Sequence, residues 1–361
     1  HPLLAGGGFP DYALYVSDGD DASPKAGPMA VVQVLFHPDV PVKQLAAAIV
    51  ARYGGFLTST LDVINTAMAV LPVNAIPALA MDDAVQWIEP PLPKLGPNND
   101  SNRTITQVET VRTAPYNLDG TGITVLVFDG GTAYAGHQDF GGRLTVHDYS
   151  GTDTHPTHVA GTIGGSGAAS GGLYRGMAPG VQLLSYGLED NGVDGWLYTD
   201  PCDVETDYNE AINTYNAMVS NNSIGTNVAW NGFPCSWEGD YSTTDILIDA
   251  MVRGSLGRTM RIVWSNGNER GGSCGLGYHT TAPPACAKNH ITVGALNSND
   301  DSMTDFSSWG PADNGRIKPD LCGPGCQSNG DEGVTSCSDE GSTAYTTMCG
   351  TSMSGPTVTG I

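Results

Sequence analysis

Basic residues are scarce in this chain, and their scarcity narrows the range of partners. Lys and Arg together number 15 in 361 residues, against 38 Asp plus Glu, so the formal net charge at pH 7 is −23. Such a surface repels phosphate backbones and anionic lipid headgroups. No apolar run approaches the roughly 20 residues that a membrane-spanning helix needs. We therefore expect no nucleic-acid partner and no membrane partner.

Cysteines are few, and they lack the close spacing of a metal site. Of the eight, only Cys322 and Cys326 lie near each other, and no paired Cys-x-x-Cys or neighbouring His completes a zinc set. An even count in an acidic chain is typical of an oxidising compartment and predicts about four disulfides in a secreted protein. The chain begins at His1 rather than Met, which fits removal of a signal peptide and equally fits a shortened chain.

Shifts in composition divide the chain into four parts. Residues 1–28, rich in Gly, Pro and Asp, indicate a loose lead-in. Residues 29–90 show short strand and helix patterns in the order β-α-β-β-α-β, which predicts a ferredoxin-like α+β module. Residues 91–104, rich in Pro and Asn, indicate a linker and maturation region, with cleavage expected between roughly residues 90 and 104. Residues 105–361 repeat apolar runs at helix-length intervals, which predicts an α/β domain with a doubly wound, mostly parallel sheet.

Three polar motifs follow apolar runs in the last of these parts. Asp129 comes directly after an apolar strand pattern and before two glycines, at the carboxyl edge of the predicted sheet. His155 and His158 open a helix of small residues, and Ser352 stands at a loop-to-helix junction where backbone N–H groups can donate. Taken singly, each motif also has a structural interpretation: a turn-forming Asp, a polar helix entry or a His pair for a metal, and an N-cap Ser.

Together these motifs resemble the subtilisin family of serine peptidases, in which Asp, His and Ser follow one another in this chain order. The resemblance covers about residues 104–361, and residues 29–90 look like the family's inhibitory propeptide. It extends to further segments of the sequence: His137-Gln138-Asp139-Phe140, Arg175-Gly176-Met177-Ala178-Pro179, Ser223-Ile224-Gly225, Ser265-Asn266-Gly267-Asn268-Glu269, Phe306-Ser307-Ser308-Trp309-Gly310-Pro311 and Lys318-Pro319-Asp320-Leu321.

The resemblance implies a secreted serine endopeptidase made as a zymogen, with a role for each matching residue. Ser352 would attack the peptide carbonyl, His155 would act as general base and acid, and Asp129 would orient the imidazole. Asn268 would complete the oxyanion hole together with the N–H of Ser352. His158 corresponds to a second, structural histidine of the motif.

The resemblance also implies the partners and the cofactors. Ser223, Ile224 and Gly225 would pair with the backbone of a peptide or protein substrate, and Ile224 favours an apolar side chain before the scissile bond. The chain's own propeptide would occupy the same cleft. No cofactor is required for the chemistry. Calcium is a candidate structural ion with Asp139 as a ligand, although the loop 164–174 lacks the Asn that commonly completes this site.

Some positions depart from the family pattern and leave an alternative open. Gly130 replaces the usual Ser or Thr, and Pro156 replaces the usual Gly at a first helical turn, which tolerates Pro. The chain stops at Ile361, so we expect the catalytic domain to be C-terminally incomplete. The alternative is a catalytically silent or processed subtilisin-like scaffold or surface-assembly protein. The group Asp129, His155, Ser352 and Asn268 opposes this alternative, because a scaffold has no need of it.

The resemblance suggests a disulfide pattern as well. Segments that the family brings together beside the nucleophile carry Cys322 and Cys349, which leaves Cys326 and Cys337 as a short loop. Proximity in sequence then pairs the remaining cysteines. The expected bonds are Cys322–Cys349, Cys326–Cys337, Cys274–Cys286 and Cys202–Cys235.

Overall fold

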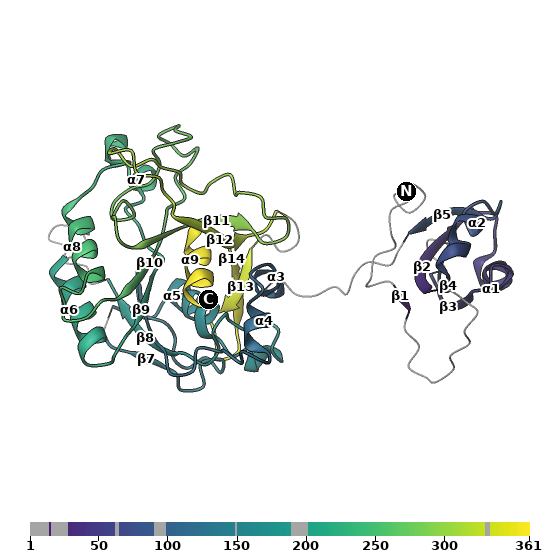
Figure 1. Ribbon diagram of the computed structural model, residues 1–361, viewed down its shortest axis with the longest axis horizontal. Helices are drawn as coiled ribbons and strands as arrows, with labels where there is room; N and C mark the ends of the chain where they lie inside the picture. Colours follow the sequence, from purple (N-terminus) through teal and green to yellow (C-terminus); the bar gives the residue numbers. More distant parts are fainter. Residues whose placement is uncertain are drawn as a thin grey trace. The chain divides into compact units, whose positions relative to one another are not determined.

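The computed structural model in Figure 1 describes residues 14–15, 28–61, 65–89, 99–148, 150–188, 201–328 and 333–361. The chain forms two compact units, His1–Leu95 and Gly96–Ile361. None of the helices within the described residues is both long enough and apolar enough to cross a bilayer.

The first unit is an antiparallel sheet with two helices. Its elements are β1 (Leu14–Tyr15), β2 (Met29–Phe36), α1 (Val42–Arg52), β3 (Phe56–Leu61), β4 (Thr66–Pro72), α2 (Ile76–Leu79) and β5 (Val85–Glu89). From β2 onward the order is β-α-β-β-α-β, and β2 lies between β4 and β5. Every second residue of β2 is buried, as expected for a sheet with one covered face. Because β1 pairs with the start of β2, the lead-in prediction is wrong for residues 14–15, and the rest of that segment lies outside the described residues.

The second unit contains the predicted doubly wound sheet, whose neighbouring strands are all parallel. In spatial order its strands are β12 (Leu321–Cys326), β11 (Ile291–Asn297), β10 (Arg261–Ser265), β9 (Val219–Asn222), β6 (Thr124–Asp129), β8 (Gln182–Gly187) and β7 (Leu144–Val146). A short antiparallel hairpin, β13 (Val334–Cys337) and β14 (Tyr345–Met348), packs beside it.

Helices cover both faces of this sheet (Figure 1). Within the described residues, the α-helices of this unit are α3 (Asn99–Ile105), α4 (Val108–Arg112), α5 (Thr154–Gly164), α6 (Pro201–Asn213), α7 (Val228–Asn231), α8 (Thr243–Val252) and α9 (Thr351–Thr359). Along β6, Leu126 and Phe128 pack into the core with α6 and α8, whereas Val125 and Val127 pack into the core with α5 and α9. Burial on both faces explains why β6 is a continuous apolar run.

The strand order creates a crevice at the carboxyl end of β6. The chain passes from β6 to β7 and β8 on one side, and then to β9 through β12 on the other. Open parallel sheets bind ligands outside the carboxyl ends of the strands at such a switch point. Asp129 is the last residue of β6, and Ser223 follows the last residue of β9.

The predicted linker 91–104 is wrong at its carboxyl end. Residues 99–104 belong to α3, and Asn102 and Arg103 are buried, with exposed fractions of 0% and 6%. The boundary between the units falls at Leu95, so the second unit begins before residue 105. Polar residues that resemble a linker can begin a helix when the rest of the fold buries their side chains.

Candidate active site

Asp129 and His155 form a short hydrogen bond at the carboxyl edge of the sheet. Asp129 is 1% exposed, and its Oδ1 lies 2.7 Å from Nδ1 of His155. The same oxygen accepts the N–H of Gly130 at 2.7 Å, which fixes the carboxylate. His155 lies in the first turn of α5, so the bond brings together the end of a strand and the start of a helix. A carboxylate on Nδ1 leaves Nε2 as the proton acceptor.

Two carboxylates control the charge of His155. Burial by itself lowers the pKa of His155, but the charge and hydrogen bond of Asp129, aided by the charge of Asp153, outweigh burial and raise the pKa above its usual 6.5. Asp153 is the N-cap of α5, and its Oδ1 accepts the backbone N–H of His155 at 2.7 Å. Asp153 was not among the residues predicted from the sequence, although an Asp two residues before a helical His is an N-cap signal.

His158 has a different environment from His155. Its side chain is fully buried, and its Nε2 donates to the carbonyl of Val334 at 2.7 Å. Burial lowers the pKa of His158 to about 4, so the ring is neutral at neutral pH. This geometry supports the structural role expected for His158, because its ring connects α5 to the hairpin β13–β14.

Ser352 lies in the first turn of α9, beside the end of β9. Its hydroxyl donates to the carbonyl of Ser223 at 3.0 Å, and the hydroxyl of Ser223 donates to the carbonyl of Ser352 at 2.7 Å. N–H groups in the first turn of a helix have no intrahelical acceptor, so the N–H of Ser352 can donate to a ligand. In this structure the Ser352 hydroxyl is therefore bonded to Ser223 rather than to His155.

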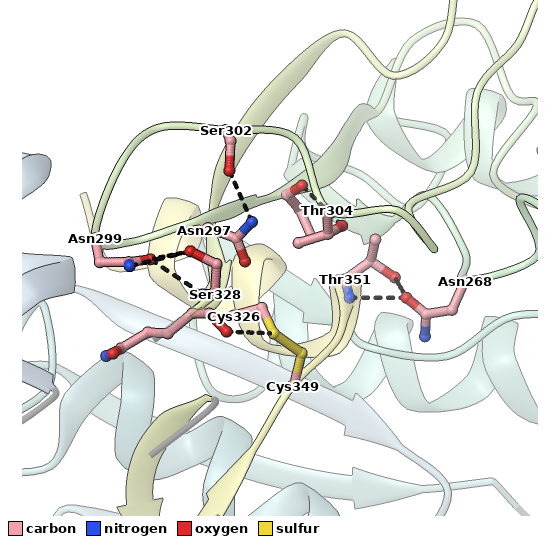
Figure 2. Close-up of a disulfide and its surroundings, with 11 residues drawn as sticks. Asn268, Asn297, Asn299, Ser302, Thr304, Cys326, Ser328, Cys349 and Thr351 are labelled. Atoms are coloured by element: carbon pink, nitrogen blue, oxygen red, sulfur yellow. Dashed lines mark hydrogen bonds between the residues drawn. A yellow bond between two sulfur atoms is a disulfide. The ribbon is translucent and has the colours of Figure 1, made fainter. Parts of the chain in front are cut away.

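Asn268 is held by Thr351, as Figure 2 shows. The Oδ1 of Asn268 accepts both the N–H and the hydroxyl of Thr351, each at 3.0 Å. These two bonds fix which end of the amide is oxygen, and the Nδ2 group points away from Thr351 (Figure 2). Sequence reasoning did not single out Thr351, because a Thr beside a Ser has no distinguishing pattern.

One cavity of about 420 Å³ collects the predicted residues. Its lining includes Asp129, His155, Ser223, Ile224, Gly225, Asn268 and Ser352, together with Asp153. A second cavity of about 570 Å³ shares Ile224 and Gly225 with the first and has a largely apolar wall. That wall includes Phe128, Leu188, Val204, Trp237, Trp264 and Pro283. Asp139 lines neither cavity.

The predicted disulfide pairs are all wrong. The structure pairs Cys235 with Cys274 and Cys326 with Cys349, at Cα–Cα distances of 5.7 and 4.6 Å. Cys286, Cys322 and Cys337 are thiols, and the side chain of Cys202 lies outside the described residues. The bond from Cys326 to Cys349 joins the end of β12 to the turn before Ser352, next to Asn268 and Thr351 (Figure 2).

These features define a doubly wound α/β protein with a cavity at the carboxyl edge of its parallel sheet. The chain belongs to the subtilase family, which matches residues 120–361.

Two relatives and one solved structure illustrate the likeness. Serine protease AprX of Bacillus subtilis (strain 168) is 32% identical over 279 residues, which are 70% of this chain and 58% of that protein. Alkaline serine exoprotease A of Vibrio alginolyticus is 30% identical over 253 residues, 68% of this chain and 38% of that protein. The CspB protease structure of Clostridium perfringens has a TM-score of 0.58 at 17% identity, covers 73% of this chain and 86% of that one, and shows the fold alone. The chain thus spans about half the length of these two relatives.

Proposed function

We propose that this chain is a secreted serine endopeptidase. The observation that carries the proposal is the meeting of Asp129, His155, Ser352 and Asn268 around one cavity. Residues from four separate segments converge there, and packing alone gives no reason for this combination. An extracellular serine proteinase among the relatives, from Thermus sp., supports secretion.

The contacts suggest how the groups would work. Asp129 would keep the proton of His155 on Nδ1, so that Nε2 could take the proton of Ser352 as its oxygen attacks the scissile carbonyl. The resulting oxyanion would accept hydrogen bonds from Nδ2 of Asn268 and from the N–H of Ser352. His155 would then pass its proton to the leaving amine, and a water molecule would release the acyl group by the same steps in reverse.

The substrate itself would release the nucleophile. The Ser352 hydroxyl now donates to the carbonyl of Ser223, which follows a strand that ends at Asn222. A substrate backbone N–H that bonds this carbonyl would compete for it and free the hydroxyl for His155. The apolar wall shared at Ile224 favours apolar side chains on the same substrate.

Product analysis on an unstructured protein such as reduced casein tests the proposal. An endopeptidase generates internal fragments from the first minutes, whereas an exopeptidase releases single residues from the ends. We expect mass spectrometry to find internal fragments whose ends follow mostly apolar residues. A chain that hydrolyses nothing would support the scaffold alternative.

Removing the amide of Asn268 should slow the chemistry more than it weakens binding. We expect Asn268→Ala to lower kcat by about 10²–10³-fold with little change in KM, because the lost donor acts mainly on the developing oxyanion. Asn227→Gly is the matched control: Asn227 lines the same cavity, and Gly tolerates its φ of 49°. Steady-state kinetics on one peptide substrate would measure both variants, and equal losses would remove Asn268 from this role.

The charge of Asp153 should influence the pH at which kcat/KM falls on the acidic side. Hydrolysis needs neutral His155, so kcat/KM should fall as pH drops through the raised pKa of His155. Asp153→Asn removes one of the charges that raise this pKa but keeps an oxygen for the helix cap. We therefore expect the acid limb of kcat/KM against pH to move to lower pH. Asp119→Asn, at a turn capped by its own carboxylate, should leave the limb in place. A shift of the Asp153→Asn limb to higher pH would contradict this assignment.

Residues 29–90 are proposed to be an inhibitory propeptide whose carboxyl end enters the cleft. Support comes from the separate core of this unit and from the family's resemblance at these residues. An extended segment after β5 could add as a strand beside residues 223–225. The isolated module should then inhibit the mature enzyme competitively.

Maturation should depend on Ser352. We expect the wild-type chain to separate into two pieces that stay associated, by a cut after Glu89 and before Asn99, because residues 99–105 are helical and poor protease substrates. The Ser352→Ala chain should remain whole. Gel electrophoresis and mass spectrometry after expression would compare them, and equal cleavage of both chains would show that another protease does the processing.

A further inference from the structure

The surroundings of Asp139 do not fit the predicted calcium ion. Its buried carboxylate already accepts three protein donors. The N–H of Ala169 lies 2.9 Å from Oδ1, while the hydroxyl of Tyr345 and the thiol of Cys337 lie 2.9 and 3.6 Å from Oδ2. Calcium needs about six to eight oxygen atoms whose lone pairs face one point. Here protons face the carboxylate, so Asp139 does not fit the role of calcium ligand that was predicted for it.

A softer metal does not fit the site either. His137, Asp139 and Cys337 have potential ligand atoms within 4.8 Å of one another. Nε2 of His137 donates to the carbonyl of Ala344 at 2.9 Å, and its Nδ1 accepts the N–H of Asp139 at 3.2 Å. Burial and the charge of Asp139 raise the pKa of Cys337 well above its usual value, which keeps the sulfur protonated. Both ring nitrogens and the thiol therefore have protein partners.

The guanidinium group of Arg103 donates hydrogen bonds to backbone carbonyls of the loop 173–175. The side chain of Arg103 is 7% exposed. Its Nη1 donates to the carbonyls of Leu173 and Arg175 at 3.1 and 2.9 Å, and its Nε lies 2.8 Å from Oε1 of Glu109. One fixed cation thus bonds two loop carbonyls and one carboxylate.

The guanidinium group of Arg112 bonds the next two carbonyls of the same loop. Nη2 of Arg112 donates to the carbonyl of Gly176 and, at 2.5 Å, to that of Met177. Nη1 of Arg112 lies 2.7 Å from the same oxygen of Glu109 that bonds Arg103. Glu109 therefore stands between the two cations and reduces their mutual repulsion.

We propose that Arg103, Glu109 and Arg112 are a built-in cationic clamp that holds residues 173–177 without a metal ion. A guanidinium group presents several N–H donors in a rigid plane, so it satisfies several carbonyls at once, as a bound cation would. Unlike a metal ion, it is attached to the chain and cannot be diluted away or chelated. The clamp acts whether or not the chain hydrolyses peptides.

The segment that carries the clamp also contacts α9, the helix that carries Ser352. Asn102, the neighbour of Arg103, is fully buried, and its Nδ2 donates to Oγ1 of Thr357 in α9 at 3.3 Å. On the other side of the loop, the rings of Tyr174 and Tyr345 lie 4.7 Å apart, and Tyr345 starts the strand that leads to Ser352. Residues 102–112 are therefore an integral part of the second unit, and losing the clamp should loosen both the loop and α9.

Thermal unfolding of the full chain carrying Ser352→Ala tests the clamp without interference from autolysis. We expect the melting temperature of the second unit to change by less than about 1 °C between EDTA and millimolar CaCl2, because the clamp itself binds and releases no ion. Adding Arg103→Ala should lower the melting temperature by roughly 5–10 °C, because two carbonyls and a carboxylate lose a buried charged donor. Arg261→Ala, at an exposed arginine of β10, should leave it unchanged.

Either of two results would overturn the proposal. One is a melting temperature that EDTA lowers by several degrees and calcium restores. The other is an Arg103→Ala chain whose melting temperature equals that of the Ser352→Ala parent. If Arg103→Ala does not fold, Arg103→Lys is the second test. An ammonium keeps the charge, but its donors share one nitrogen and do not reproduce the separate Nε and Nη1 donors of Arg103, so this chain should melt below the parent. A lysine variant equal to the parent would show that the forked geometry is not needed.

Discussion

Ser352→Ala should lower kcat for peptide hydrolysis by about 10⁶-fold and leave the fold intact. The hydroxyl of Ser352 makes one hydrogen bond, to the carbonyl of Ser223, and Ala fits the same space. Without the nucleophile, only the oxyanion donors and binding would act on a bound peptide, which leaves a small residual rate. Steady-state hydrolysis of a peptide would give the rate, and circular dichroism would confirm folding.

Ser354→Ala provides the matched control for this variant. Ser354 lies two residues further along α9, and its hydroxyl donates to the carbonyl of Thr351 within the same helix. The variant removes an equivalent hydroxyl that does not line the cavity. We expect it to retain activity within a few-fold of the parent. A Ser352→Ala chain as active as Ser354→Ala would remove Ser352 from the chemistry.

Asp129→Asn should lower kcat/KM by about 10⁴-fold at neutral pH. Oδ1 of Asp129 lies 2.7 Å from Nδ1 of His155 and also accepts the N–H of Gly130. An amide at this position can turn its NH₂ group toward His155 and hold the ring with its proton on Nε2. That tautomer cannot accept the proton of Ser352, so the base is lost while the packing is kept.

The same exchange at Asp153 is the control, because Asp153 lines the same cavity but bonds the backbone of His155. At its own optimal pH, Asp153→Asn should be nearly as active as the parent. Comparable losses in both variants would mean that the general charge of the cavity, rather than the orientation of His155, controls activity.

The sequence could place Asp129, His155 and Ser352 at the ends of secondary-structure elements, because each lies at the end or in the first turn of an element that its neighbouring residues specify. Their catalytic roles stay a prediction. A short apolar run followed by glycines is typical of a strand that is buried on both faces, and the last residue of such a parallel strand lies at the carboxyl edge of the sheet. Strands with weak patterns are harder to predict from sequence. β7 has three residues, and β12 contains two glycines and Pro324, which are tolerated there because β12 is an edge strand.

The geometry of β12 explains why Cys326, rather than Cys322, pairs with Cys349. Cys322 and Cys326 lie near the two ends of this strand, and only its carboxyl end reaches the edge where Cys349 precedes Ser352. The resemblance instead suggested Cys322 as the partner of Cys349. Cys235 begins a short 3-10 helix and Cys274 lies in a turn 39 residues further along the chain, where neither periodicity nor proximity in sequence indicates a pairing.

The role of Arg103 was beyond sequence reasoning for a related reason. Residues 91–104 have the composition of a linker, and a helix of this kind is stable only because the rest of the unit buries Asn102 and Arg103. Two partners of Arg103 are backbone carbonyls some 70 residues away, at 173 and 175. Every residue has a backbone carbonyl, so the sequence does not show which carbonyls accept hydrogen bonds from Arg103.

Covalent labelling of the folded chain by a fluorophosphonate tests the central claim most directly. Such a reagent reacts with a serine only when a neighbouring base and an oxyanion hole activate it. We predict a single adduct, located on Ser352 by peptide mapping, that disappears in His155→Ala and after thermal unfolding. A folded, mature wild-type chain that takes up no label, or that carries it on another serine, would contradict the account.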